Sequence, residues 1–191
     1  QMMYNPVFEN ELDITFNTSF SKYGYFSKNS IDLSDAGFST NSQVVCGLIT
    51  KENFFNSTVE AKMVINEMTN DAYAGIVFNS TADANYPSAD ADGINYNYPY
   101  CGFLLSFENG EVALKYIKFK NHAILARKYY DYVPGEEIDI KIIQNNNNYI
   151  VYIDGEEIFN INANICSLSG GVGVFASNAD AVFKTLKVNK D

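Results

Sequence analysis

The stretch that decides the fold is EEIDIKIIQNNNNYIVYIDGEEIFNI, residues 136–161, followed by GGVGVFASNADAVFKTLKV, residues 170–188. Isoleucines at every second position from 138 to 142 alternate with charged residues, and this period of two predicts an extended strand with one buried face. The asparagines at 145–148 and the pair Asp154-Gly155 are turn signals, each followed by another apolar segment. The tail of the chain therefore predicts an antiparallel meander.

The rest of the chain shows similar segments separated by polar turns. Aromatic residues make up 15% of the sequence without one tryptophan, and charged residues only 19%, which suits strands better than exposed helices. We predict an all-β fold, an antiparallel two-sheet β-sandwich, in one domain over residues 1–191 with 1–10 as a lead-in. Further strands are expected at residues 12–16, 55–65, 73–79, 103–107, 111–118 and 123–130, with turns at Asn109-Gly110 and Lys120-Asn121.

The glycine pattern G-G-V-G-V-F at 170–175 and the final strand V-F-x-x-L-x-V at 182–188 resemble the last third of concanavalin A-like jelly-roll domains. Residues 47–188 are similar in pattern to carbohydrate-binding modules of family 66, which accompany fructan-degrading enzymes, and to laminin-G-like modules. The resemblance implies a concanavalin A-like jelly roll that binds carbohydrate without cleaving it. It also implies a secreted or cell-surface location within a larger bacterial polysaccharide-processing or adhesive protein.

The charge of the chain narrows the choice of partner. The sequence carries 13 basic and 23 acidic residues, a net charge of −10, which repels nucleic acid and anionic membrane surfaces. Its apolar runs are too short for a transmembrane helix, so no membrane insertion is expected. The three cysteines lack the spacing of a zinc site. An oligo- or polysaccharide is the partner that the resemblance implies, and a neutral sugar is indifferent to this charge.

A segment without periodicity, residues 80–99, interrupts the meander, and loops of this length in a compact domain are often functional. Tyrosine rings can stack on sugar rings while amide and carboxylate groups bind the hydroxyls. Asp90, Asp92 and Asn95 resemble part of a calcium loop and are candidate Ca²⁺ ligands, although a solvated turn explains the same residues. The loop candidates for sugar contact are Asp92, Tyr96, Tyr98 and Tyr100.

One further cluster and two single positions contribute candidate residues. Arg127, with Tyr130 nearby, can donate to sugar hydroxyls or form a surface ion pair. By the resemblance, Asn79 stands where family 66 modules carry a fructose-binding arginine, and Asp180 matches an aspartate near their last hairpin. The predicted ligand-binding residues are Asn79, Asp92, Tyr96, Tyr98, Tyr100, Arg127, Tyr130 and Asp180.

Two alternatives to noncatalytic binding remain open. Glu137 and Asp139 begin a motif similar to that of family 16 glycoside hydrolases, but Lys141 stands where the next carboxylate of that face is needed. A hydrolase or lyase would therefore use acids from different strands, such as Glu60, Glu108 or Asp92. A laminin-G-like protein-adhesion module is the other alternative. The one histidine, His122, is expected in a solvated turn.

Overall fold

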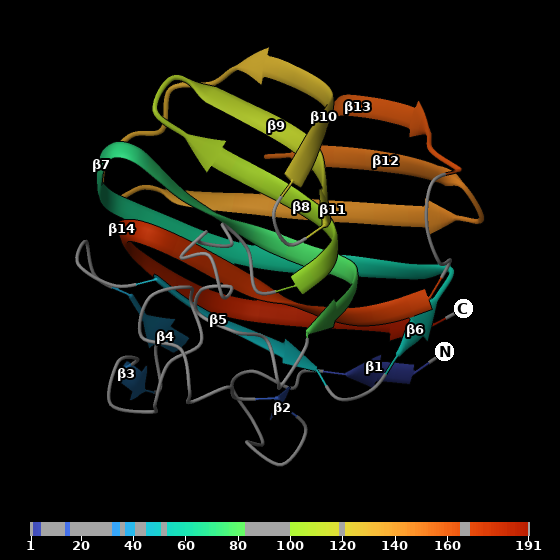
Figure 1. Ribbon diagram of the computed structural model, residues 1–191. Helices are drawn as coiled ribbons and strands as arrows, with labels where there is room; N and C mark the ends of the chain where they lie inside the picture. The colour runs from blue at the N-terminus through green and yellow to red at the C-terminus, as the bar shows by residue number, and fades with distance from the viewer. Residues whose placement is uncertain are drawn as a thin grey trace, which may run out of the picture.

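The computed structural model describes residues 2–4, 14–15, 32–34, 37–40, 45–50, 53–82, 100–118, 121–164 and 169–190, and all regular structure in these ranges is β-strand (Figure 1). The strands are β1 (Met2–Tyr4), β2 (Ile14–Thr15), β3 (Asp32–Ser34), β4 (Gly37–Ser39), β5 (Val45–Thr50), β6 (Phe54–Phe55), β7 (Ser57–Ala82), β8 (Tyr100–Glu108), β9 (Glu111–Lys118), β10 (Asn121–Tyr129), β11 (Glu137–Asn145), β12 (Asn148–Ile153), β13 (Glu156–Asn162) and β14 (Ser169–Lys190). The all-β prediction is confirmed.

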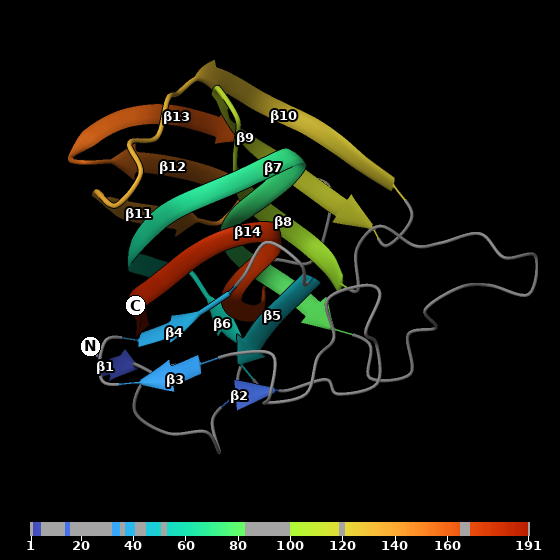
Figure 2. The ribbon, with the colours of Figure 1, turned by 90° about the vertical axis from the view of Figure 1, so that its left-hand side faces the viewer.

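A long ribbon formed by β7 and β14 organises the two layers. The two strands pair antiparallel along their whole length, from Ser57 with Lys190 to Ser80 with Gly171. The ribbon folds over near its middle, where Asp71 and Asn178 adopt positive φ angles of 63° and 55°, and Figure 2 looks onto this bend. Each half of the ribbon therefore belongs to a different layer.

Sheet 1 contains the half of the ribbon in which the start of β7, at Ser57, pairs with the end of β14, at Lys190. Its strands follow the order β13, β12, β11, β7 and β14, with β1 and β4 pairing with the same part of β14. Every second residue of β11 is buried, which is the alternation that the isoleucines predict. The predicted turn at 145–148 and the Asp154-Gly155 hairpin are both present, with positive φ angles at Asn146, Asp154 and Gly155.

Sheet 2 contains the other half of the ribbon. Its strands follow the order β10, β9, β8, β7, β14 and β5, with β2 pairing with β5. β8 and β9 form a hairpin closed by Asn109-Gly110, as predicted, and β10 continues the meander at the edge. The whole is an antiparallel two-sheet sandwich.

The core fills the space between the two sheets. Alternate residues of β8 and β9 point inward, among them Phe103, Leu105 and Leu114, and they meet Ile140 and Val151 from sheet 1. All five are at most 3% exposed. Burial of this apolar surface is the main force that holds the layers together.

Two details differ from the sequence-based expectations or refine them. Residues 55–65 and 73–79, predicted as two strands, form one bent strand because β14 pairs with both parts. Gly170 fits a close approach, since a Cβ there would stand 2.5 Å from backbone atoms of Asn79 and Ser80. Within the described ranges, no helix has the length and apolarity needed to span a membrane.

Candidate functional site

The outer face of sheet 2 carries a group of polar side chains on the strands β8, β9 and β10. The residues of β8 and β9 that alternate with the core positions point to this face. Two of them, Leu104 and Ile117, form a separate apolar cluster with Tyr73 and Val77 of β7 and Phe175 of β14. Glu108 and Glu111 lie at the β8–β9 turn, so this end of the face offers hydrogen-bonding groups.

A buried ion pair stands at the centre of these polar groups. The Lys115 ammonium lies 3.0 Å from the Glu108 carboxylate, and the two side chains are only 7% and 28% exposed. The hairpin register brings them to the same face, because Glu108 pairs with Glu111 and Lys115 lies two outward positions further along β9. Burial of the lysine is tolerated because its charge is neutralised by this partner.

His122 lies beside this pair on the neighbouring strand. Its pKa is lowered from the ordinary value, mainly because burial disfavours the charged imidazolium and further because Lys115 repels it, while Glu108 acts in the opposite direction. The imidazole is therefore neutral at pH 7, able both to donate and to accept a hydrogen bond. The expectation of a turn histidine is wrong, since His122 is the second residue of β10.

A second, exposed ion pair lies further along the same edge. Arg127 Nε donates a 2.6 Å hydrogen bond to Glu111 Oε1, and this bond raises the pKa of the guanidinium. The arginine side chain is 61% exposed, so most of its donors face solvent. Tyr129 follows two residues later, opposite Glu111, and is 95% exposed. An aromatic ring and a bound guanidinium thus stand side by side on β10.

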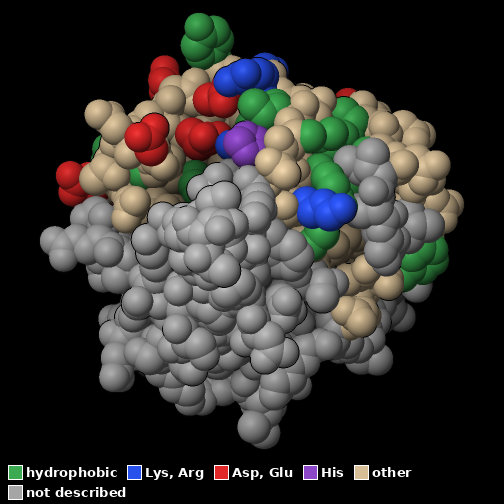
Figure 3. All heavy atoms as spheres, viewed as in Figure 1, with side chains coloured by type: hydrophobic (Ala, Val, Ile, Leu, Met, Phe, Trp, Pro, Cys, Tyr) green, Lys and Arg blue, Asp and Glu red, His purple; other side chains and the backbone are tan. Residues whose placement is uncertain are grey.

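These groups form one surface, which we call the β10 face: Glu108, Glu111, Lys115, His122, Arg127 and Tyr129. In Figure 3 acidic side chains and the histidine lie next to one another on the upper part of the molecule, over β8 to β10. The Ser106 hydroxyl is fully buried and has no hydrogen-bond partner among the described residues. The β10 face combines charged, neutral and aromatic groups within a few strand spacings.

The sequence-predicted ligand residues fall at opposite ends of sheet 2. Arg127 belongs to the β10 face, and Tyr130 packs edge-on against Phe107 with ring centroids 5.3 Å apart. Tyr100 begins β8 at the other end, paired with Ala82, about 20 Å away along the strand. Asp90, Asp92, Asn95, Tyr96 and Tyr98 lie outside the described residues.

Asn79 and Asp180 occupy other environments. Asn79 is 6% exposed and donates its side-chain amide to the Tyr149 hydroxyl at 2.8 Å, so its polar group acts within the core. Asp180 is half-buried on β14, opposite Glu67 in sheet 1 and close to the bend of the ribbon. The structure therefore does not bring Asn79, Asp180 and Arg127 together.

The acids considered for catalysis also lie apart. Glu137 and Asp139 point outward from sheet 1 and bind Lys62 at 3.5 and 3.8 Å. Glu60 is on the same outer face of sheet 1, whereas Glu108 is on the outer face of sheet 2. Since the sandwich separates these two faces, Glu60 and Glu108 cannot flank one glycosidic bond. No group of three or more potential metal-ligating side chains occurs within the ranges that the structure describes.

The search for relatives by sequence gives nothing: no family model matches, and no curated protein matches significantly. The carbohydrate-binding module CBM66 from Bacillus subtilis matches in structure with a TM-score of 0.64 at 14% identity, over 83% of this chain and 91% of that chain. The Bacillus licheniformis β-glucanase gives a TM-score of 0.68 at 10% identity, over 100% of this chain and 99% of that chain. The chain has the concanavalin A-like jelly-roll fold.

A third similar structure is the exoplasmic/lumenal domain of VIP36 in a Ca²⁺/Man3GlcNAc-bound form. Its TM-score is 0.62 at 10% identity, over 85% of this chain and 83% of that chain. Identities this low establish the common architecture and not a common ligand. The predicted resemblance to concanavalin A-like domains is thereby confirmed at the level of fold.

Proposed function

We propose that this chain is a noncatalytic carbohydrate-binding module that holds a neutral glycan against the β10 face. The observation that carries the proposal is the exposed Tyr129 ring beside the Arg127–Glu111 pair. A sugar ring has an apolar C–H face and a rim of hydroxyls, so it fits a surface that offers an aromatic plane next to fixed polar groups. Arg127 and Glu111 would donate to and accept from neighbouring hydroxyls, as would the neutral His122.

The charge state of the β10 face favours an uncharged ligand. Glu108 is neutralised by Lys115 and Glu111 by Arg127, so the lysine and the arginine of the β10 face are each paired with a carboxylate. Such paired charges favour an uncharged ligand over a phosphate or sulfate. The overall charge of −10 would further repel an anionic polymer. Two of the similar structures, a carbohydrate-binding module and a β-glucanase, support this class of ligand.

Binding without cleavage is favoured by the position of the cations. In a glycosidase two carboxylates stand on either side of the scissile bond, roughly 5–10 Å apart. Here Lys115 and Arg127 contact the two carboxylates that share the β10 face. Each of the two carboxylates is therefore already bound to a cation, which disfavours its use as a nucleophile or as a proton donor.

The proposed contact surface extends beyond the β10 face. Tyr100, with Asp92, Tyr96 and Tyr98 before it, would extend the contact surface to longer glycans. Asp90, Asp92 and Asn95 would hold Ca²⁺ if the loop binds a metal, since their oxygens are suitable ligands. We also propose that the chain is one domain of a larger protein, secreted or at the cell surface, and that linked copies or an attached enzyme increase its effective affinity.

Glycoside hydrolysis is the second candidate function, because one pair of carboxylates has a suitable spacing. Glu108 and Glu111 are directly opposite in the β8–β9 hairpin, where Cβ atoms are about 5 Å apart. Substrate binding would have to displace Lys115 or Arg127 from them. Release of reducing sugar by the wild-type chain and not by E108Q or E111Q would support this function over simple binding.

A glycan array with the purified chain tests the proposed function. We expect retention of one or more neutral glycans, loss of about tenfold or more in affinity for R127A and for Y129A, and no change for K128A. Lys128 is a matched control, because it lies on the same strand and points to the other side. A parallel array in the presence of a chelator tests whether glycan retention requires calcium. Retention that survives both R127A and Y129A would reject the β10 face as the site.

A further inference from the structure

A hollow on the outer face of sheet 1 is the second surface feature with the character of a binding site. Its volume is about 590 Å³, and its lining comes from β7, β11, β12, β14 and the Asp154-Gly155 turn. That volume lies within the range of small-molecule sites. The hollow is open at Gly155, where an added Cβ would meet no atom within 4 Å. It lies on the opposite side of the sandwich from the β10 face.

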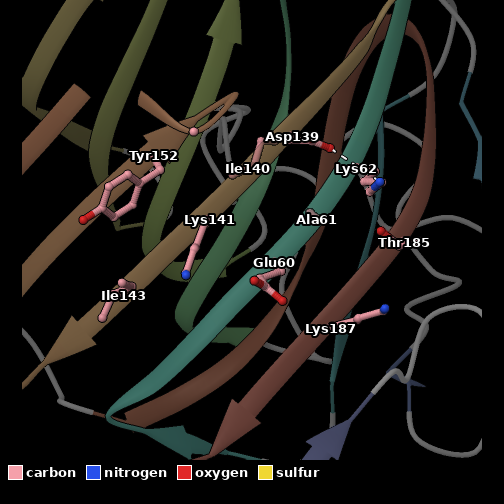
Figure 4. Close-up of a pocket in the computed structure, with 11 residues that line it drawn as sticks. Glu60, Ala61, Lys62, Asp139, Ile140, Lys141, Ile143, Tyr152, Thr185 and Lys187 are labelled. Carbon is pink, nitrogen blue, oxygen red and sulfur yellow. Dashed lines mark ion pairs between the residues drawn. The ribbon is translucent and has the colours of Figure 1, made fainter. Parts of the chain in front are cut away.

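The strand register places four residues of the hollow in one row. Lys187 pairs with Glu60, Glu60 pairs with Lys141, and Lys141 pairs with Tyr152. The row crosses β14, β7, β11 and β12, and three strand spacings of about 4.8 Å give it a length of about 14 Å. Figure 4 shows these side chains on successive strands, with Glu60 between the two lysines.

The charges in this row are not balanced as they are elsewhere on sheet 1. Lys62 binds Glu137 and Asp139, and Lys184 binds Glu137 at 3.7 Å. Lys141 and Lys187, by contrast, form no ion pair with any described residue. Within the row from Lys187 to Tyr152, two ammonium groups thus flank a single carboxylate, an excess of one positive charge on a chain whose net charge is −10. The next carboxylate along the row is that of Glu157, on β13 opposite Tyr152. An anionic group of a ligand would balance it.

The remaining walls of the hollow suit a ring with hydroxyls. Tyr152 and Ile143 provide apolar surface at one end, while the Thr185 hydroxyl can donate or accept a hydrogen bond and the Glu60 carboxylate can accept one from a ligand hydroxyl. A bare phosphate or sulfate would use the lysines and leave the tyrosine ring without a partner. A sugar ring that bears a carboxylate would use both parts of the row.

We propose that the hollow of Glu60, Lys141, Tyr152, Thr185 and Lys187 is a second binding site, specific for a saccharide that carries carboxylate groups. The site is independent of the β10 face, because it lies on the other sheet and shares none of its residues. In such a complex the ring of one sugar unit stacks on Tyr152 with its carboxylate at Lys141. The carboxylate of a neighbouring unit reaches Lys187, and Glu60 accepts hydrogen bonds from hydroxyls. Binding weakens with added salt, since it depends on exposed charges.

Calorimetric titration with a trimer of galacturonic acid tests this site, with its methyl ester as the uncharged control ligand. We expect K141A/K187A and Y152A each to weaken binding of the acid about tenfold or more, and the methyl ester to bind at least tenfold more weakly than the acid. Equal binding of acid and ester, or wild-type affinity in K141A/K187A, would overturn the proposal. Because the lysines are solvent-facing, K141A/K187A should remain folded, and K128A controls for loss of charge elsewhere.

The variant R127A separates this site from the proposed function. R127A should bind the acid trimer as the wild type does, even where it has lost the neutral glycan. Loss of acid binding in R127A would assign the acidic ligand to the β10 face and overturn the inference. Failure of all neutral glycans to bind would reject the proposed function while leaving a positive result for the hollow intact.

Discussion

The side-chain amide of Asn79, on β7 in sheet 2, donates a 2.8 Å hydrogen bond to the hydroxyl of Tyr149, on β12 in sheet 1. Both residues are buried, at 6% and 0% exposure. The Tyr149 ring packs against Phe103 and Phe78, with centroids 4.6 and 5.8 Å away. One polar bond inside an aromatic cluster thus joins the two layers of the sandwich.

The first prediction concerns this bond. Replacement of Asn79 by Ala removes the donor of this bond, and Y149F removes its acceptor. Each variant should lower the free energy of unfolding by about 1–3 kcal/mol, as measured by urea titration. The double variant should cost less than the sum of the two, because both changes remove the same hydrogen bond. Additive losses would show that the bond contributes no coupling.

The second prediction concerns the buried pair of Glu108 and Lys115. E108Q leaves the lysine charge uncompensated in a position only 7% exposed, so it should destabilise the chain by about 2–4 kcal/mol. The double variant E108L/K115M, which removes both charges, should recover much of that loss. Thermal unfolding of the three proteins measures the difference. A double variant less stable than E108Q would contradict the assignment of the cost to the unpaired charge.

The third prediction concerns His122 and pH. Burial, together with Lys115 and against the weaker effect of Glu108, lowers the pKa of His122 in the folded chain below its ordinary value of 6.5. As pH falls through 6.5, the unfolded chain takes up the proton first, so the free energy of unfolding decreases until the lowered pKa is reached. The free energy of unfolding of the wild type, relative to that of H122Q, should therefore decrease as the pH falls from 7 to 5. A constant difference over that range would mean that His122 titrates alike in both states.

The fourth prediction concerns the exposed pair of Arg127 and Glu111. Because the arginine side chain is 61% exposed, R127A should change the free energy of unfolding by less than about 1 kcal/mol. Circular dichroism during heating should show nearly the same transition as the wild type. A large loss of stability would mean that loss of glycan binding in R127A reflects unfolding and not a missing contact.

The fifth prediction concerns the close approach at Gly170. A Cβ there would stand 2.5 Å from the backbone carbon of Asn79 and the backbone nitrogen of Ser80, so one of the strands must shift in G170A. We expect a loss of about 1–3 kcal/mol by urea titration, the cost typical of overpacking. The matched control is G135A, since a Cβ at Gly135 would meet nothing within 4 Å. G135A should cost only about 1 kcal/mol, because of its positive φ. Equal losses in the two variants would contradict a steric cause.

Local sequence signals predicted the strands and the turns well. The isoleucines of β11 alternate with charged residues because one face is buried, and Asp154-Gly155 favours the positive φ angles of a tight hairpin. The continuity of β7 was not predictable in this way, because residues 66–71, apart from Met68, are polar and turn-like. Their extended course depends on pairing with β14, more than a hundred residues away along the chain.

The candidate sites were harder to predict from the sequence, because their contacts are formed between strands. Arg127 was a candidate from its isolation as the single arginine, but its partner Glu111 becomes its neighbour only through the β9–β10 register. The row from Lys187 to Tyr152 depends on three such registers. Asn79 gave no local signal of burial, because Tyr149 lies 70 residues away along the chain.

The most direct test of the account is to map a bound glycan by NMR chemical shifts. A neutral oligosaccharide retained on the array is titrated into the isotopically labelled chain, and perturbed backbone amides are assigned. We predict perturbations concentrated in residues 106–116 and 121–130, around the β10 face, with little change in β11 and β12. Perturbations confined to another surface, or none with any neutral glycan, would contradict the claim that this face recognises carbohydrate.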